Sequence, residues 1–385
     1  MEDHTEFEAR LTSRGEHVQI GTITEPACPA ASGRGVWNKL EAVPVTCLDS
    51  DTTWPFQSLE AQQSILGDML KGPPAPRFGI GEWYGRLFDR LSPDERVDFA
   101  MRALGGKELR PNCPFRRPVD GRPQLCTKKG GVCSLQLYET DDGSLGKLPD
   151  DHRSHLRTLC PYRFEEAGTV LEWVAEDLLE TRVPLEIPEV GFLKAELSEE
   201  VEGIPEDVGR IDLVLVHPDL DRLNWCAVEM QAVYFSGAEM AVEYHLARDF
   251  EGECVPFPAK NHRPDYRSSG PKRLMPQLQI KVPTLRRWGK KMAVVVDEPF
   301  FSSLGKMDDV KDPSNADIGW YVVRLERING VARLEPAFKR LTTLERAVEG
   351  LTAGLPVTLK EFEVNIKNKL VKRGLVPRSG GGSGR

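Results

Sequence analysis

The sequence of 385 residues contains no apolar run long enough to span a membrane. Its first residues, MEDHTEFEAR, lack the pattern of a secretory signal, and no internal repeat is visible. We therefore expect a cytosolic protein without membrane partners. At this length the chain can bury a large core and hold two or three structural units.

Net positive charge is also lacking, since the formal charge is −8. An even spread of that charge would argue against nucleic-acid binding, but the spread is uneven. From Lys260 to Lys291 ten Lys or Arg residues oppose one acid, Asp265. Such a separation predicts a surface that faces a polyanion on an otherwise acidic protein. The alternative is a solvated basic face with no partner.

The stretch GRIDLVLVHPDLDRLNWCAVEMQAVYFSG, residues 209–237, indicates a β-hairpin. If its turn centres between Leu220 and Asp221, Asp212 lies opposite Glu229 among apolar side chains of the same face. Two buried carboxylates repel each other unless a cation or a proton compensates them. A hard divalent cation would do so. An edge hairpin with a solvated acidic end, or a slipped register, is the alternative.

Eight cysteines in a cytosolic chain argue against disulfides and favour metal binding. Four of them, Cys113, Cys126, Cys133 and Cys160, lie among Pro, Gly and Lys residues. Such a set suits a structural site that stabilises a loop-rich unit, and ligand chemistry alone favours zinc over iron. The spacing does not match two CxxC pairs, so four unrelated free thiols remain the alternative.

Two basic segments supply candidate DNA contacts. Residues 107–133 contain seven Lys or Arg against two acids, and residues 260–291 form the second segment. Arginine can contact guanine bidentately, whereas lysine mostly holds phosphate. The candidates are Arg116, Arg117, Lys128 and Lys129 in the first segment and Arg263, Arg267, Lys272, Arg273 and Gln277 in the second.

The order of predicted helices and strands indicates an α+β, or mixed α/β, fold. We divide the chain into an N-terminal extension (1–106), a four-cysteine metal-binding unit (107–163), a nuclease core with the second basic segment (164–373) and a stretch that we interpret as a tag remnant (374–385). The extension is expected to be helical from about residue 55, with helices over 58–71, 80–91 and the segment that Ser92 caps.

Asp212 followed by Glu229-Met230-Gln231 resembles the motif of the PD-(D/E)xK nuclease superfamily, although this sequence has Gln231 where lysine is usual. The wider order of parts is similar to the NotI-like type II restriction endonucleases. These parts are CPF, GGVC, LCPYR, a helix with EW, IDLVLV and VEMQAVYFSG. The resemblance runs from about Cys113 to about Arg346, and the residues before it have no counterpart.

The resemblance implies a homodimeric nuclease of the bacterial cytoplasm with a PD-(D/E)xK core. It implies Mg²⁺-dependent cleavage of double-stranded DNA at a GC-rich palindrome, giving 5′-phosphate and 3′-hydroxyl ends. It also implies that the four cysteines bind one iron ion, in place of zinc. The implied catalytic residues are Asp212, Glu229 and Gln231, and the implied Mg²⁺ ligands are Asp212, Glu229 and the Met230 carbonyl.

Because Gln231 carries no charge, another cation is needed, and Lys281 and Lys272 are the candidates. Two rival functions remain open. One is a RecB-like exonuclease with an iron–sulfur cluster, although its cysteines usually bracket the nuclease core. The other is a non-catalytic DNA-binding protein that a metal unit stabilises.

Overall fold

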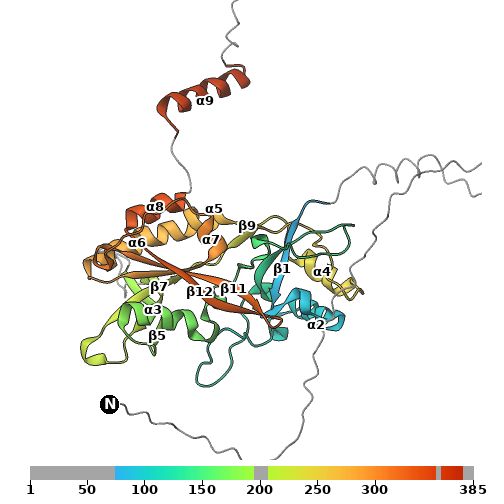
Figure 1. Cartoon of the computed structure of the whole chain (residues 1–385), viewed down its shortest axis with the longest axis horizontal. Coiled ribbons are helices and arrows are strands. Elements are labelled where there is room, and N and C mark those ends of the chain that lie inside the picture. The colour runs from blue at the N-terminus through green and yellow to red at the C-terminus, as the bar shows by residue number, and fades with distance from the viewer. Residues whose placement is uncertain (1–73, 195–206, 353–356, 376–385) are drawn as a thin grey trace, which may run out of the picture. The chain divides into compact units, whose positions relative to one another are not determined.

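A six-stranded mixed sheet dominates the computed structural model, in which residues 74–194, 207–352 and 357–375 are described (Figure 1). Hydrogen bonding gives the order β12-β11-β10-β7-β6-β5. The strands are β5 (Leu185–Lys194), β6 (Asp207–Val216), β7 (Trp225–Met230), β10 (Met292–Asp297), β11 (Ile318–Ile328) and β12 (Val331–Thr342). The helix expected over 58–71 and most of the expected tag lie outside the described residues.

Both faces of this sheet are covered by helices. β10 lies in its middle, parallel to β7 and β11, and all of its residues are buried. A continuous apolar run is what a central parallel strand requires. One face packs against α6 (Met275–Arg287) and the other against α3 (Thr169–Leu179), as Figure 1 shows. The predicted mixed α+β class is confirmed.

The β6–β7 hairpin has the predicted register. Val214 pairs with Ala227, as expected for a turn centred between residues 220 and 221. The same register, continued to the open end of the hairpin, places Asp212 opposite Glu229. Since Val214 and Ala227 pack in the cluster that contains the buried face of α6, both carboxylates face that helix.

A second, four-stranded antiparallel sheet has the order β2-β1-β3-β4. Its strands are β1 (Arg77–Trp83), β2 (Arg86–Leu87), β3 (Val132–Tyr138) and β4 (Arg157–Thr158). This corrects the helix that we predict over 80–91. Tyr84 and Gly85 have φ of 48° and 83°, which makes a tight turn that no helix contains. β1 also pairs with β3, a partner too distant in sequence for local periodicity to reveal.

The helix that Ser92 is expected to cap is α2 (Pro93–Leu104). The side chains of Ser92 and Glu95 form a capping box at its start. The other helices are α4 (Ala241–Asp249), α5 (Tyr266–Ser269), a π-helical turn (Gly270–Leu274), α7 (Glu298–Ser302), α8 (Leu344–Thr352) and α9 (Leu359–Lys372), besides α2 (Pro93–Leu104). Short 3₁₀ turns include η1 (Phe88–Arg90), η3 (Lys129–Gly131), η5 (Pro161–Gly168) and η6 (Leu220–Arg222), and β8 (Tyr234–Ser236) pairs with β9 (Arg263–Asp265). No helix among the described residues is long and apolar enough to cross a membrane.

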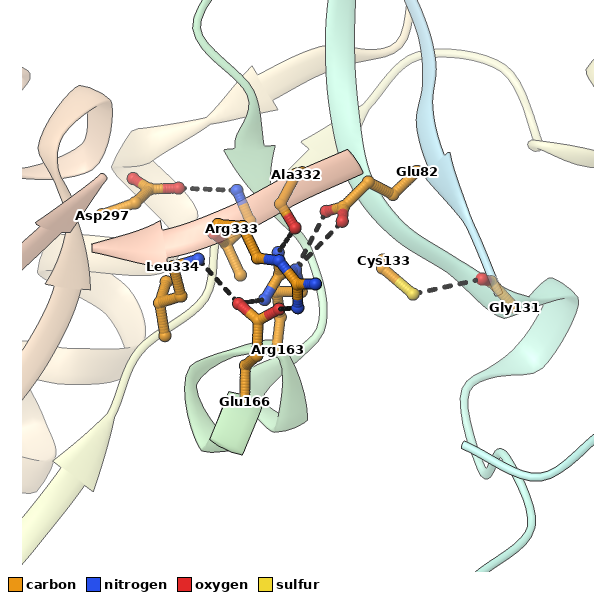
Figure 2. A network of polar contacts seen from close by, with 10 residues as sticks. Glu82, Gly131, Cys133, Arg163, Glu166, Asp297, Ala332, Arg333 and Leu334 are labelled. Carbon is orange, nitrogen blue, oxygen red and sulfur yellow. Dashed lines mark hydrogen bonds and ion pairs between the residues drawn. The ribbon is translucent and has the colours of Figure 1, made fainter. Parts of the chain in front are cut away.

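A buried ion-pair network connects the two sheets (Figure 2). Arg163 Nε lies 3.1 Å from both carboxylate oxygens of Glu82 on β1, and neither side chain is exposed. The guanidinium also donates to Glu166 Oε2 at 2.8 Å and to the Ala332 carbonyl on β12 at 3.0 Å. Glu166 in turn accepts a hydrogen bond from Leu334 N at 2.6 Å. Arg163 thus compensates Glu82 and holds the small sheet against the large one.

Arg163→Met is expected to lower the free energy of unfolding by about 3 kcal/mol, because it leaves Glu82 buried and unpaired. Urea unfolding measures this loss, and the midpoint should fall while the m-value stays unchanged. Arg333→Met is the matched control. Its guanidinium lies 3.4 Å from Glu166 but is 57% exposed, so less than about 1 kcal/mol is expected. Equal losses in the two variants would contradict this role of Arg163.

Candidate active site

Two carboxylates and one ammonium group meet at the open end of the β6–β7 hairpin. Lys281 Nζ on α6 lies 2.6 Å from Glu229 Oε2 and 3.2 Å from Asp212 Oδ1. Glu229 and Lys281 are buried, whereas the Asp212 side chain is 51% exposed. The cluster therefore opens to solvent on the Asp212 side. The structure brings the predicted carboxylate pair together, and Lys281 is the candidate lysine that contacts both.

Lys281 is buried because it lies on the apolar side of α6. Leu278, Val282 and Leu285 of the same helix side are buried in the core. A buried ammonium group is costly unless it is paired, and Glu229 supplies the close partner. A lysine within an apolar helical stripe is thus a signal in the sequence for this residue, although it does not identify the partner.

Burial raises the pKa of Glu229 to about 7. The charge of Asp212 raises it as well, whereas Lys281 lowers it. In the metal-free protein Glu229 therefore titrates near neutral pH. A cation that binds at this carboxylate must compete with a proton, so binding is expected to weaken as the pH falls below about 7.

Glu229→Gln is expected to change the stability of the metal-free protein more favourably at pH 8 than at pH 5. Lys281 loses its close partner at both pH values, so this cost cancels in the comparison. Folding raises the pKa of Glu229, so its contribution to stability is full below the unfolded pKa of 4.5 and is lost as the pH rises through about 7. The effect of the substitution on the free energy of unfolding should therefore differ by about 2–3 kcal/mol at most between the two pH values. Thermal unfolding in EDTA at both pH values measures it. Glu239→Gln, at an exposed position, is the control. An effect that is equal at both pH values would refute the account.

Met230 and Gln231 follow Glu229 and line the same pocket. The Gln231 side-chain amide donates to the carbonyl of Ala232 at 2.5 Å, and its backbone N donates to the carbonyl of Val295 at 3.0 Å. Gln231 thus contributes a neutral amide at the position where lysine is usual in the resembling motif. The positive charge beside the carboxylates comes from Lys281 instead.

A pocket of about 420 Å³ contains both carboxylates and four of the predicted DNA contacts. Lys128 comes from the cysteine-bearing segment, Lys272 and Arg273 from the π-helical turn, and Gln277 from the first turns of α6. The remaining lining residues are Leu159, Pro161, Met230, Gln231, Ala232, Tyr234 and Pro276. Acidic and basic groups thus share one open site, where a cation and a phosphate can both be held.

Five other predicted DNA contacts are not among the residues that line this pocket: Arg116, Arg117, Lys129, Arg263 and Arg267. Arg117 lies 2.7 Å from Glu186 on β5, which offsets its charge. The Arg116 guanidinium stacks over Tyr162, 4.7 Å from the ring centroid. Lys129 lines an adjacent, mainly apolar pocket of about 550 Å³. Arg263 on β9 and Arg267 on α5 are exposed.

The four predicted metal-binding cysteines lie in one region. Cys126, Cys133 and Cys160 are buried, and Cys113 is partly exposed. Burial raises the pKa of each buried thiol, to about 11 for Cys160, and the charge of neighbouring cysteines raises it further. The four sulfurs are therefore close enough to repel one another as thiolates.

Three backbone hydrogen bonds act in the opposite direction. Those at Lys128 and Tyr162, each two residues after a cysteine, lower the pKa of the preceding thiol, and the one at Gly85 lowers the pKa of Cys133. Cys133 Sγ meanwhile donates to the Gly131 carbonyl at 3.5 Å (Figure 2). Within the described ranges no group of three or more His, Cys, Asp or Glu is placed to hold a metal.

Tyr234 is a pocket residue that the sequence did not indicate. Its ring lies under the Arg273 guanidinium, with Cζ 3.6 Å from the ring centroid. Only its position directly after the second hairpin strand marks it in the sequence, and no spacing predicts that an arginine nearly forty residues later stacks on it.

The described geometry agrees with the family comparison. No curated protein matches the chain. The family model described as restriction endonuclease NotI matches residues 104–335, more than half of the chain. That span contains the four cysteines, both carboxylates and Lys281. Restriction endonucleases typically use a divalent metal such as Mg²⁺. The protein therefore belongs to the restriction endonuclease NotI family and is a site-specific deoxyribonuclease that binds and cleaves double-stranded DNA.

Proposed function

We propose that the protein hydrolyses both strands of DNA at a specific GC-rich palindrome in a Mg²⁺-dependent reaction, leaving 5′-phosphate and 3′-hydroxyl ends. The observation that carries the proposal is the cluster of Asp212, Glu229 and Lys281, whose two carboxylates line a pocket that also holds basic side chains. A palindrome is matched by a twofold axis, so we propose that the active form is a homodimer.

The donor set suits magnesium. Mg²⁺ takes oxygen ligands and is usually held by one or two carboxylates, with water and substrate phosphate completing its shell. Asp212 and Glu229 would supply these carboxylates, and the Met230 carbonyl is the third expected protein ligand. When bound, Mg²⁺ supplies positive charge at the scissile phosphate and lowers the pKa of a water molecule.

The chain's own residues have distinct roles in this proposal. Lys281 keeps the two carboxylates together and provides a fixed positive charge beside the reacting phosphate. Gln231 positions the attacking water through its amide. Lys128 and Lys272 hold neighbouring phosphates, which fixes the DNA along the pocket without reading its sequence.

We also propose that Cys113, Cys126, Cys133 and Cys160 bind one iron ion, with zinc as the alternative. Support comes from the shared location of the four thiols, the burial of three of them and the backbone hydrogen bonds that favour thiolates. The metal would stabilise a segment that has little regular structure.

Cys133→Ser is expected to lose the bound metal and to lower the melting temperature. Inductively coupled plasma mass spectrometry of the purified protein should find one iron or zinc ion per chain in the wild type. Cys226→Ser is the matched control, since Cys226 is buried on β7 outside the set, and it should retain the metal. Wild-type protein without stoichiometric metal would refute the proposal. Acid-labile sulfide would indicate an iron–sulfur cluster instead.

The decisive experiment is incubation of the protein with a large GC-rich DNA of known sequence, with Mg²⁺ or with EDTA. Discrete fragments that require Mg²⁺ would support the proposal, and end mapping would give the site and the end chemistry. Resection from DNA ends would indicate the exonuclease. A mobility shift without cleavage in any divalent metal would indicate a DNA-binding protein and would refute the catalytic proposal.

A further inference from the structure

A cation–π stack lies in the catalytic pocket, between Tyr234 on β8 and Arg273 in the π-helical turn. Arg273 Cζ is 3.6 Å from the Tyr234 ring centroid, the shortest such contact in the described part of the chain. Both residues line the pocket that contains Asp212 and Glu229. Both are also exposed, Tyr234 to 44%. Burial therefore does not hold this pair in place, and its own contacts must.

The backbone of Tyr234 is held by hydrogen bonds to β9 and α5. Tyr234 pairs with Asp265 in the β8–β9 ladder, and its backbone N donates to Ser269 Oγ at 2.8 Å. Ser269 is fully buried, and its hydroxyl donates to the carbonyl of Asp265 at 2.8 Å. The ring is thus presented to the pocket on a strand whose position is set by hydrogen bonds on two sides.

Arg273 is placed by the π-helical turn Gly270–Leu274, which leads into α6. Such turns are rare and occur frequently at functional sites. Leu274, the next residue, is buried in the core, so the turn is fixed while Arg273 points into the pocket. Arg273 has no carboxylate partner among the residues that the structure describes, unlike Arg117, which pairs with Glu186. Its charge and its N–H donors are therefore available to a ligand.

We infer that Tyr234 holds the Arg273 guanidinium for a bidentate contact with the O6 and N7 atoms of one guanine in each half-site. The inference rests on the proposed function and names the residues that give part of its specificity. Stacking occupies the face of the guanidinium and leaves its edges free, and two parallel N–H donors match the guanine edge. A phosphate can accept the same two donors, and the test below separates the two contacts, because a guanine contact changes sequence preference whereas a phosphate contact changes affinity for all sequences. Tyr234 is a positioning residue in this arrangement, and Arg273 determines specificity.

The test is binding selection from a pool of random-sequence DNA duplexes in EDTA, where cleavage does not interfere, followed by sequencing. The variants are Tyr234→Phe, Tyr234→Leu and Arg273→Lys. Lys290→Met is the matched control, because Lys290 Nζ lies 5.3 Å from the Trp225 ring centroid, outside the catalytic pocket. Thermal unfolding of each variant excludes loss of folding as the cause.

We expect the wild type, Tyr234→Phe and Lys290→Met to enrich the same sequence. Arg273→Lys and Tyr234→Leu should lose about tenfold or more of the preference for guanine at one position of each half-site, with the other positions unchanged. Unchanged preferences in both variants would overturn the inference. A uniform loss of affinity for all sequences would overturn it in favour of a phosphate contact. In that case the slope of log affinity against log salt concentration should also become smaller by about one.

Cleavage of the enriched sequence in Mg²⁺ distinguishes the two failures. If the wild type selects and cuts a sequence while the variants keep its guanine preference, the inference fails and the proposed function stands. If the wild type enriches no sequence and produces no discrete fragments, both fail.

Discussion

Asp212→Ala is expected to lower the rate of DNA cleavage by at least about 10⁴-fold, while specific DNA binding persists. Asp212 is the exposed carboxylate of the cluster and lies 3.2 Å from Lys281. In the proposed mechanism its removal leaves Glu229 as the single carboxylate ligand in the pocket and deprives the reaction of metal-derived charge stabilisation worth several kcal/mol. DNA binding depends on the basic side chains, which the substitution leaves in place.

Single-turnover cleavage of plasmid DNA measures this effect, and a mobility-shift assay in EDTA measures binding. Asp221→Ala is the control, since Asp221 is exposed in the η6 turn of the same hairpin, outside the pocket. It should cleave at the wild-type rate. Cleavage by Asp212→Ala within about tenfold of the wild type would exclude the carboxylate pair as the catalytic centre.

The hairpin could be predicted from the sequence because its cause is local. Alternating apolar residues and a polar turn fix the register within one short stretch, and that register sets Asp212 opposite Glu229. The helix that Ser92 caps is local in the same sense. The family resemblance then gave these residues a role that their pattern alone does not give.

The parts that the sequence did not reveal depend on contacts between distant segments. The stretch that forms β1 has helix-like spacing, and only its pairing with β3 and the turn at Tyr84 and Gly85 make it a strand. Arg163 and Glu82 find each other over a comparable separation. Neither periodicity nor propensity carries information about such partners.

Contacts between distant segments also decide which basic residues serve the site. Ten of them lie between Lys260 and Lys291, and charge alone does not rank them. The fold buries one of them, Lys281, against the carboxylates and stacks another, Arg273, on Tyr234 in the same pocket. Strand pairing and the role of each basic residue are therefore hard to predict for the same reason. Both depend on contacts with segments that are distant in the sequence.

Lys281→Met is expected to lower the cleavage rate by about 10³-fold at pH 8 and saturating Mg²⁺. The methionine keeps an apolar stem on the buried side of α6 but removes the positive charge at 2.6 Å from Glu229. Loss of one preorganised charge beside a reacting phosphate typically costs 10²–10³-fold in rate. Lys290→Met, which lies outside the pocket, should retain wild-type activity.

The charge of Lys281 also has a consequence for pH, which separates an electrostatic role from a purely structural one. Burial and Asp212 raise the pKa of Glu229 and Lys281 lowers it, so that the net pKa is about 7. Without the lysine that pKa must rise further, so more Glu229 is protonated at a given pH. At subsaturating Mg²⁺ the activity profile of Lys281→Met should therefore shift to higher pH, and more Mg²⁺ should be needed at pH 7. A variant that is slower but keeps the wild-type pH profile and Mg²⁺ requirement would show that Lys281 does not act on Glu229 through its charge.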